Sequence, residues 1–201
     1  LPITLASVVV QLSALIDNVT IPNRLEKAYS LNRAYFETSF SKLMEDGVTM
    51  TDFLFGCFAT VLPIFQLVSA FTNTLGKSSL PNITTAWTLK DKKGLKTNVE
   101  SVLRVTMLVA APASMGIAFL SGPIIQLLFS NLEGANSVAP VVLSLLGVAA
   151  LFLALMTPLN SIFQGIGRMD LPVKILSIGV IIKFVLNFIL VAIPSVNIVG
   201  A

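Results

Sequence analysis

Residues 53–75 read FLFGCFATVLPIFQLVSAFTNTL, a run without a single charged side chain. About 20 predominantly apolar residues are enough for one α-helix to cross the roughly 30 Å of hydrocarbon in a bilayer. The rest of the chain has the same character, because 55% of its 201 residues are hydrophobic and only 11% are charged. A soluble domain has about 25% charged residues. The predicted fold class is therefore all-α, a polytopic transmembrane helix bundle.

Four other stretches are long and apolar enough to span a membrane, namely residues 1–21, 105–129, 138–162 and 173–193. The third predicted span, residues 105–129, contains two prolines and two glycines, which packed membrane helices accept better than soluble helices do. We expect residues 1–201 to form a single transmembrane domain with about five spans. Because the chain opens on one apolar run and stops just after another, we also expect it to be part of a longer protein.

The charges between the spans predict the orientation of the helices, since basic loops face the cytoplasm. Residues 77–104 carry six basic and two acidic side chains, and residues 168–174 sum to one positive charge. Residues 17–52 carry four basic and six acidic side chains, and the turn at residues 131–136 carries only Glu133. The first two loops should therefore face the cytoplasm and the other two should face outward. The first helix then runs from inside to outside.

A basic cluster stands in the first of these cytoplasmic loops and consists of Lys90, Lys92, Lys93 and Lys96. The positive-inside rule accounts for such a cluster without a further role. We therefore expect no nucleic-acid partner, and the partner that the composition predicts is the lipid bilayer.

The outer connection between the first two spans is long for a helical bundle. Residues 24–44 are moderately amphipathic, with Leu25, Ala28, Leu31 and Tyr35 at helical spacing. This segment is either a helix that lies at the membrane interface or a continuation of the first span beyond Pro22. The sequence leaves both alternatives open.

Polar residues inside four of the spans fall on stripes, because side chains three and four positions apart share one helix face. The stripes are Thr4, Ser7, Gln11 and Asn18 with Asp17 beside its end; Gln66, Ser69 and Asn73; Thr157, Asn160 and Gln164; and Gly179, Lys183 and Asn187. Each stripe taken alone is explained by hydrogen bonds between packed helices, worth about 0.6–2 kcal/mol each. Together the stripes give four helices one polar face each.

Lys183 differs from the other stripe residues because it carries a charge almost halfway along the last span. A lysine at the centre of a membrane helix costs about 2.5–3.5 kcal/mol on insertion scales. It should therefore face either a partner carboxylate or a water-filled cavity. Asp17 is the acid in the chain that lies at the edge of a striped span, near its outer end, so a direct pair is one alternative. Our hypothesis is the other one, a polar cavity in which Lys183 offers positive charge to an anionic substrate.

The chain lacks the residues that several enzyme classes need, because it has no histidine and a single cysteine, Cys57. Zinc sites, Ser-His-Asp triads and internal disulfides are therefore not expected. A membrane glycosyltransferase would need a catalytic acidic loop, and the acidic residues of the outer connection show no recognisable arrangement. We expect a protein that is not an enzyme and that needs no cofactor or metal.

Short motifs occur in an order that resembles the multidrug, oligosaccharidyl-lipid and polysaccharide flippase superfamily. They are Pro81-Asn82, Leu103-Arg104, Ala111-Pro112, Gly122-Pro123-Ile124, residues 163–168, then Gly179, Lys183 and Asn187, and residues 197–201. The later motifs are similar to the polysaccharide transporter branch, which includes the stage V sporulation protein B group. The resemblance implies a MATE-like half-transporter fragment, with the first five helices of a second lobe and the first lobe missing.

The resemblance also implies a function, the flipping of a polyprenyl-pyrophosphate-linked sugar across the bacterial cytoplasmic membrane by alternating access. Such a flippase would serve cell-envelope polysaccharide or peptidoglycan synthesis. Lys183 and Asn187 match the lysine and amide of the branch, and Asp17 and Arg24 match its acidic and Arg-Leu positions. The other expected cavity residues are Gln11, Gln66, Asn73, Asn160 and Gln164. The alternatives are a multidrug cation antiporter, which would need buried carboxylates, and a membrane subunit that does not transport.

Overall fold

The computed structural model describes residues 2–40, 48–129 and 135–191. The elements are α1 (Pro2–Leu31), α2 (Arg33–Phe40), α3 (Met50–Thr88), α4 (Lys92–Phe119), α5 (Ser121–Leu128), α6 (Ala135–Gly165) and α7 (Asp170–Leu190). Within these ranges the chain forms helices and no strand, so the predicted all-α class is confirmed. The middle of the outer connection, most of the turn at residues 131–136 and the closing motif at residues 197–201 lie outside the described residues.

Helices α3 and α6 contain the second and fourth predicted spans, and α4 and α7 contain most of the third and fifth. Each is long and apolar enough to cross a membrane, and the chain is a multi-pass membrane protein. The first predicted span, residues 1–21, lies on α1, which is 30 residues long. That α1 itself crosses the membrane stays a prediction.

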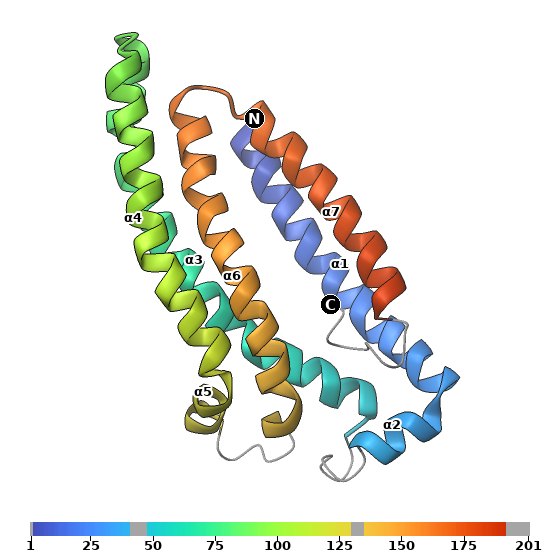
Figure 1. Cartoon of the computed structure of the whole chain (residues 1–201). Coiled ribbons are helices and arrows are strands. Elements are labelled where there is room, and N and C mark those ends of the chain that lie inside the picture. Colours follow the sequence, from blue (N-terminus) through green and yellow to red (C-terminus); the bar gives the residue numbers. More distant parts are fainter. Residues whose placement is uncertain (1, 41–47, 130–134, 192–201) are drawn as a thin grey trace.

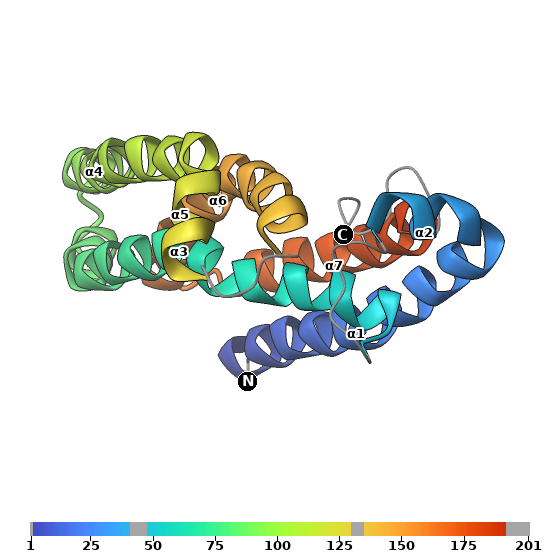
Figure 2. The same ribbon diagram turned by 90° about the horizontal axis from the view of Figure 1, so that it is seen from below.

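The helices form two groups that α3 connects (Figure 1). Helices α3, α4 and α6 pack together with the short α5, and α1 packs against α7. Seen from below, α4, α5 and α6 lie toward one end of the molecule, α1 and α2 lie toward the other, and α3 runs from one group to the other (Figure 2). The pairing of α1 with α7 brings together the first and the last described helices.

Small residues allow the helices of the first group to approach closely. A Cβ added at Gly147 of α6 would lie 2.7 Å from the backbone nitrogen of Ala118 on α4. A Cβ added at Gly76 of α3 would lie 2.9 Å from the Cα atom of Pro158 on α6. Membrane helices associate through such contacts because lipid tails are as apolar as side chains, so packing replaces the hydrophobic effect between helices.

A hydrogen bond between two threonines also joins α3 to α6. The hydroxyls of Thr72 and Thr157 lie 2.9 Å apart, and Thr72 is fully buried. Thr157 belongs to one of the predicted stripes, whereas Thr72 was not among the predicted residues. This stripe therefore contributes at least one of its members to helix packing.

The third predicted span, residues 105–129, is wrong as a single helix. Helix α4 ends at Phe119 and α5 begins at Ser121. The reason is Pro123, whose ring would clash with the carbonyl of Phe119 four positions earlier and which has no N–H to donate to it. In α5 the same proline occupies the first turn, where a missing N–H is tolerated.

The outer connection follows the second of the two predicted alternatives. Helix α1 continues through Pro22 to Leu31, and the short α2 follows it. The edge of the Phe36 ring on α2 packs against Tyr29 of α1, with the ring centroids 5.9 Å apart. Phe36, Leu25 and Ala28 are buried in the same hydrophobic core, so these three side chains face the protein, whereas Leu31 is exposed.

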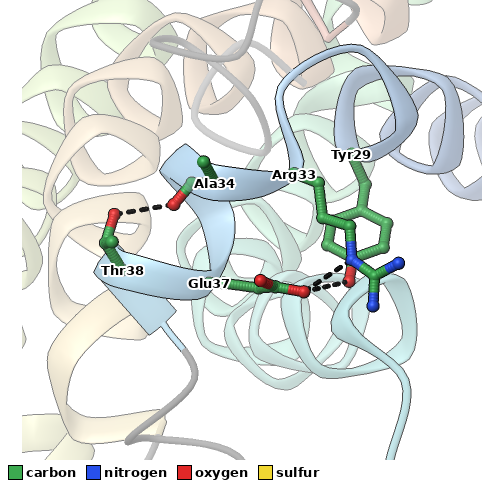
Figure 3. A network of polar contacts seen from close by, with 5 residues as sticks. All are labelled: Tyr29, Arg33, Ala34, Glu37 and Thr38. Atoms are coloured by element: carbon green, nitrogen blue, oxygen red, sulfur yellow. Dashed lines mark hydrogen bonds and ion pairs between the residues drawn. The ribbon is translucent and has the colours of Figure 1, made fainter.

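A polar network at the exposed side of the corner between α1 and α2 fixes α2 (Figure 3). Arg33 donates from Nε to Glu37 Oε1 at 2.6 Å, and the hydroxyl of Tyr29 donates to the same oxygen at 3.3 Å. The hydrogen bond from Arg33 is the main cause that lowers the pKa of the Glu37 carboxyl below its ordinary value of 4.5. The charged form of Glu37 therefore stabilises the folded corner.

Acid is expected to loosen this corner. A carboxyl with a lowered pKa stabilises the fold above its ordinary pKa, and this contribution is lost as the pH falls through the lowered value. We expect the amides of α2 to lose protection from hydrogen exchange, relative to their intrinsic rates, below about pH 4. The effect is small because the pair is exposed, and exposed pairs contribute little. If the Glu37→Gln variant loses as much protection in acid as the wild type does, another group is responsible.

Candidate functional site

An ion pair joins α1 to α7 near the middle of both helices. Lys183 Nζ donates to Asp17 Oδ2 at 2.5 Å. Asn187, one turn further along α7, donates from Nδ2 to Asp17 Oδ1 at 3.1 Å. Both oxygens of the Asp17 carboxylate therefore have a partner on α7. We call Asp17, Lys183 and Asn187 the polar clasp.

The two helices bring the clasp together because they run in the same direction from a similar height, downward in Figure 1. Asp17 lies 15 residues after Pro2, and Lys183 lies 13 residues after Asp170. At 1.5 Å per residue these positions are about 22 and 20 Å along their helices. Asp17 thus lies level with Lys183. Asp17 lies in the middle of α1, because α1 continues for ten residues beyond residue 21; its depth near the outer end of the membrane span stays a prediction.

The structure therefore shows the alternative in which Lys183 pairs with a carboxylate. The Asp17 side chain is 18% exposed and that of Lys183 is 42% exposed, while Asn187 is buried. An ammonium group has three N–H donors, and the structure gives that of Lys183 one partner. Lys183 thus compensates the partly buried carboxylate and still presents donors on its open side.

Arg24 makes a second contact between α1 and α7, two turns after Asp17. Its Nε donates to the carbonyl of Phe188 at 3.0 Å, and its Cζ atom lies 3.2 Å from the centroid of the Phe188 ring. Phe188 lies in the last turn of α7, which ends at Leu190, and carbonyls at a helix end can accept hydrogen bonds from outside the helix. A cation also interacts favourably with an aromatic face and with a helix C-terminus.

Phe188 is a contact that sequence reasoning missed. Phe188 contacts Arg24 through its backbone carbonyl and the face of its ring. Neither group contributes to a pattern of polar side chains. The available signal was its place next to Asn187 in the last turn of a helix. Asp17, Arg24 and Lys183 together carry a net charge of +1, so the region attracts an anion.

The other predicted site residues do not join the clasp. Gln11, Gln66 and Gln164 are exposed, and Asn73 and Asn160 are half-buried. Among the described residues, no hydrogen bond or ion pair connects these five to Asp17, Lys183 or Asn187. The side chains of Thr4 and Ser7 lie outside the described part of the chain. The structure thus gathers four of the nine predicted residues, and a role for the other five stays a prediction.

The chemistry of this site is that of charge and hydrogen bonding. The part of the chain that the structure describes contains no group of three or more His, Cys, Asp or Glu side chains that could hold a metal ion. The clasp offers an ammonium, an amide and, two turns away, a guanidinium. Phosphate and carboxylate groups are the ligands that such donors bind most strongly.

Comparison with known proteins gives a consistent set of relatives. A family profile described as lipid II flippase MurJ matches residues 58–200. The uncharacterised membrane protein YabM of Bacillus subtilis is 31% identical over 139 residues, 69% of this chain and 25% of that protein. The lipid II flippase MurJ of the same organism is 27% identical over 158 residues, 79% of this chain and 28% of that protein.

An archaeal relative, an uncharacterised membrane protein of Methanocaldococcus jannaschii, is 30% identical over 140 residues, 70% of this chain and 27% of that protein. The chain thus spans about a quarter of the length of the curated relatives it matches. No solved structure shows a significant match. The range of the family profile includes Lys183 and Asn187 but not Asp17 or Arg24.

Proposed function

Because the chain belongs to the lipid II flippase MurJ family, we propose that it is the part of a flippase that meets the pyrophosphate of a polyprenyl-linked sugar. The complete protein would move this lipid across the bacterial membrane by alternating access. Its product would serve the synthesis of cell-envelope polysaccharide or peptidoglycan.

The observation that carries the proposal is the half-exposed ammonium of Lys183 in the polar clasp. Lys183 lies 13 residues after the start and seven residues before the end of an apolar helix, and a charge inside a membrane helix marks a functional position by default. Its pairing with Asp17 satisfies the carboxylate but leaves donors of the ammonium unused. A pyrophosphate carries more negative charge than one carboxylate, so it competes with Asp17 for Lys183.

This competition suggests how binding is linked to movement. In the present structure Asp17 and Asn187 tie α1 to α7. A pyrophosphate that takes Lys183 weakens the tie, and its release lets Asp17 pair again. A ligand shifts a conformational equilibrium only through contacts that differ between the two states, and the contact between Asp17 and Lys183 is such a difference.

The clasp supports a flippase over a multidrug cation antiporter. An antiporter needs a buried carboxylate that is free to take up a cation. Asp17 is the acid that the predicted spans offer, and both of its oxygens already have partners on α7. A tethered lysine therefore occupies the place that a transported cation would need.

A transport assay with the full-length protein tests the proposal. Proteoliposomes would contain a fluorescent polyprenyl-pyrophosphate disaccharide, with fluorescent phosphatidylcholine as the matched neutral lipid and ethidium as the organic cation. We expect transport of the pyrophosphate lipid alone. Export of ethidium without movement of the pyrophosphate lipid would replace the proposal with the antiporter, and movement of no probe would indicate a subunit that does not transport.

A further inference from the structure

The turn between α3 and α4 has an unusual residue at its tightest point. The Asp91 N–H donates to the Ala86 carbonyl at 2.9 Å, and the Lys90 N–H donates to the Trp87 carbonyl at 3.1 Å. These two bonds form a Schellman motif, whose left-handed position is usually glycine. Here that position is Lys90, with a φ of 56°. The turn therefore keeps a lysine side chain where an L-residue is strained.

The acidic residue of this turn has another task. Asp91 caps α4, and its Oδ1 accepts a hydrogen bond from the Gly94 N–H at 2.9 Å. Lys96 pairs with Glu100 further along α4. Among the described residues, the ammonium groups of Lys90 and Lys92 have neither an ion pair nor a hydrogen bond. Two cations of the turn are therefore open to an external anion.

These two lysines line a hollow of about 560 Å³, whose other lining residues are Ala86, Trp87, Thr88, Asp91 and Leu95. Its volume falls within the range of about 300–1,000 Å³ that is common for small-molecule sites. Trp87 is 49% exposed, and its neighbour Leu89 is 73% exposed. The hollow thus combines a cationic side with exposed apolar surface.

We propose that this hollow binds the headgroup of an anionic phospholipid. The ammonium groups of Lys90 and Lys92 hold the phosphate, and Trp87 lies against the glycerol, since tryptophan favours the membrane interface. The turn lies one helical turn beyond Ile83, which packs against Gly165 at the end of α6, and it belongs to the loop that the charges assign to the cytoplasmic side. Anionic lipids are concentrated in that leaflet, and basic pockets at helix ends bind them. This lipid stays in place and is distinct from the transported one.

The full-length protein in nanodiscs tests the proposal through Trp87, the only tryptophan of this chain. Its fluorescence is isolated by subtraction of a Trp87→Phe variant. We expect acrylamide to quench Trp87 at least twofold less in discs that contain phosphatidylglycerol than in discs of phosphatidylcholine alone. Lys90→Gln with Lys92→Gln should abolish this protection. Lys93→Gln with Lys96→Gln, which removes the same charge from the start of α4 but not from the hollow, should keep it.

A variant that relieves the strained backbone separates binding from folding. Lys90→Gly suits the left-handed position, so its Tm should stay equal or rise while part of the protection is lost. Equal quenching in both kinds of disc would overturn the proposal, and so would equal losses in the two double variants. Protection by polyprenyl pyrophosphate in phosphatidylcholine discs, without protection by phosphatidylglycerol, would also overturn it and would assign the hollow to the substrate.

Discussion

Lys183→Met is expected to lower transport of a polyprenyl-pyrophosphate sugar by at least tenfold in proteoliposomes of the full-length protein. Methionine has a similar length but offers no charge to the pyrophosphate. A hydrogen bond to a charged group contributes about 1.5–3 kcal/mol, and 1.4 kcal/mol corresponds to a factor of ten. The variant also leaves the largely buried Asp17 with Asn187 as its partner, which adds to the defect.

Three further variants identify the cause of that loss. Lys183→Arg keeps the charge in a different geometry and should retain part of the transport. Lys174→Met removes a lysine from the same helix, where it pairs with Asp170 on the surface, and should leave transport unchanged. Lys183→Met with Asp17→Asn should recover the Tm but not the transport, because the unpaired charge is gone and the cation is still missing. Full transport by Lys183→Met would rule out a role for this charge.

The second large effect is expected on folding, from Gly147→Val. Its Cβ would lie 2.7 Å from the nitrogen and 2.8 Å from the Cα atom of Ala118. These are backbone atoms, so the contact between α4 and α6 has to open rather than let a side chain turn away. Overpacking of this kind costs about 1–3 kcal/mol or more. We expect a clear fall in the Tm and yield of the purified full-length protein.

Gly116→Ala on α4 is the matched control for Gly147→Val. A Cβ at Gly116 meets nothing within 4 Å, and alanine is favoured over glycine inside a helix by about 0.5–1 kcal/mol. Its Tm should therefore be unchanged or slightly higher. Equal losses in both variants would mean that α4 and α6 do not make the close contact described here.

Much of the fold follows from the sequence, because membrane helices can be recognised as long segments without charged residues. The uncharged run at residues 53–75 predicts a membrane helix. The free-energy cost of burying a lysine within a span predicted that Lys183 needs a carboxylate partner or water. The break at Leu120 was also within reach, since Pro123 disfavours a continuous helix. The prolines of membrane helices are often tolerated, and for that reason this one was read as part of a span.

The choice of partner for Lys183 was beyond the sequence. It depends on how far α1 continues after Pro22 and on which helix lies beside α7, and neither is encoded in a local pattern. Thr72 and Phe188 were missed for a related reason. A buried threonine in an apolar run has no distinctive spacing, and a carbonyl at a helix end has no side-chain signature.

In the proposed mechanism a pyrophosphate competes with Asp17 for the ammonium of Lys183. Equilibrium binding of a polyprenyl-pyrophosphate disaccharide to the full-length protein, compared among the wild type, Lys183→Met and Asp17→Asn, tests it most directly. We expect opposite effects on the affinity, with binding at least tenfold weaker in Lys183→Met and tighter in Asp17→Asn, where the lysine has lost its internal competitor. Equal weakening in both variants would contradict competition, and unchanged binding in Lys183→Met would show that the headgroup does not meet this lysine.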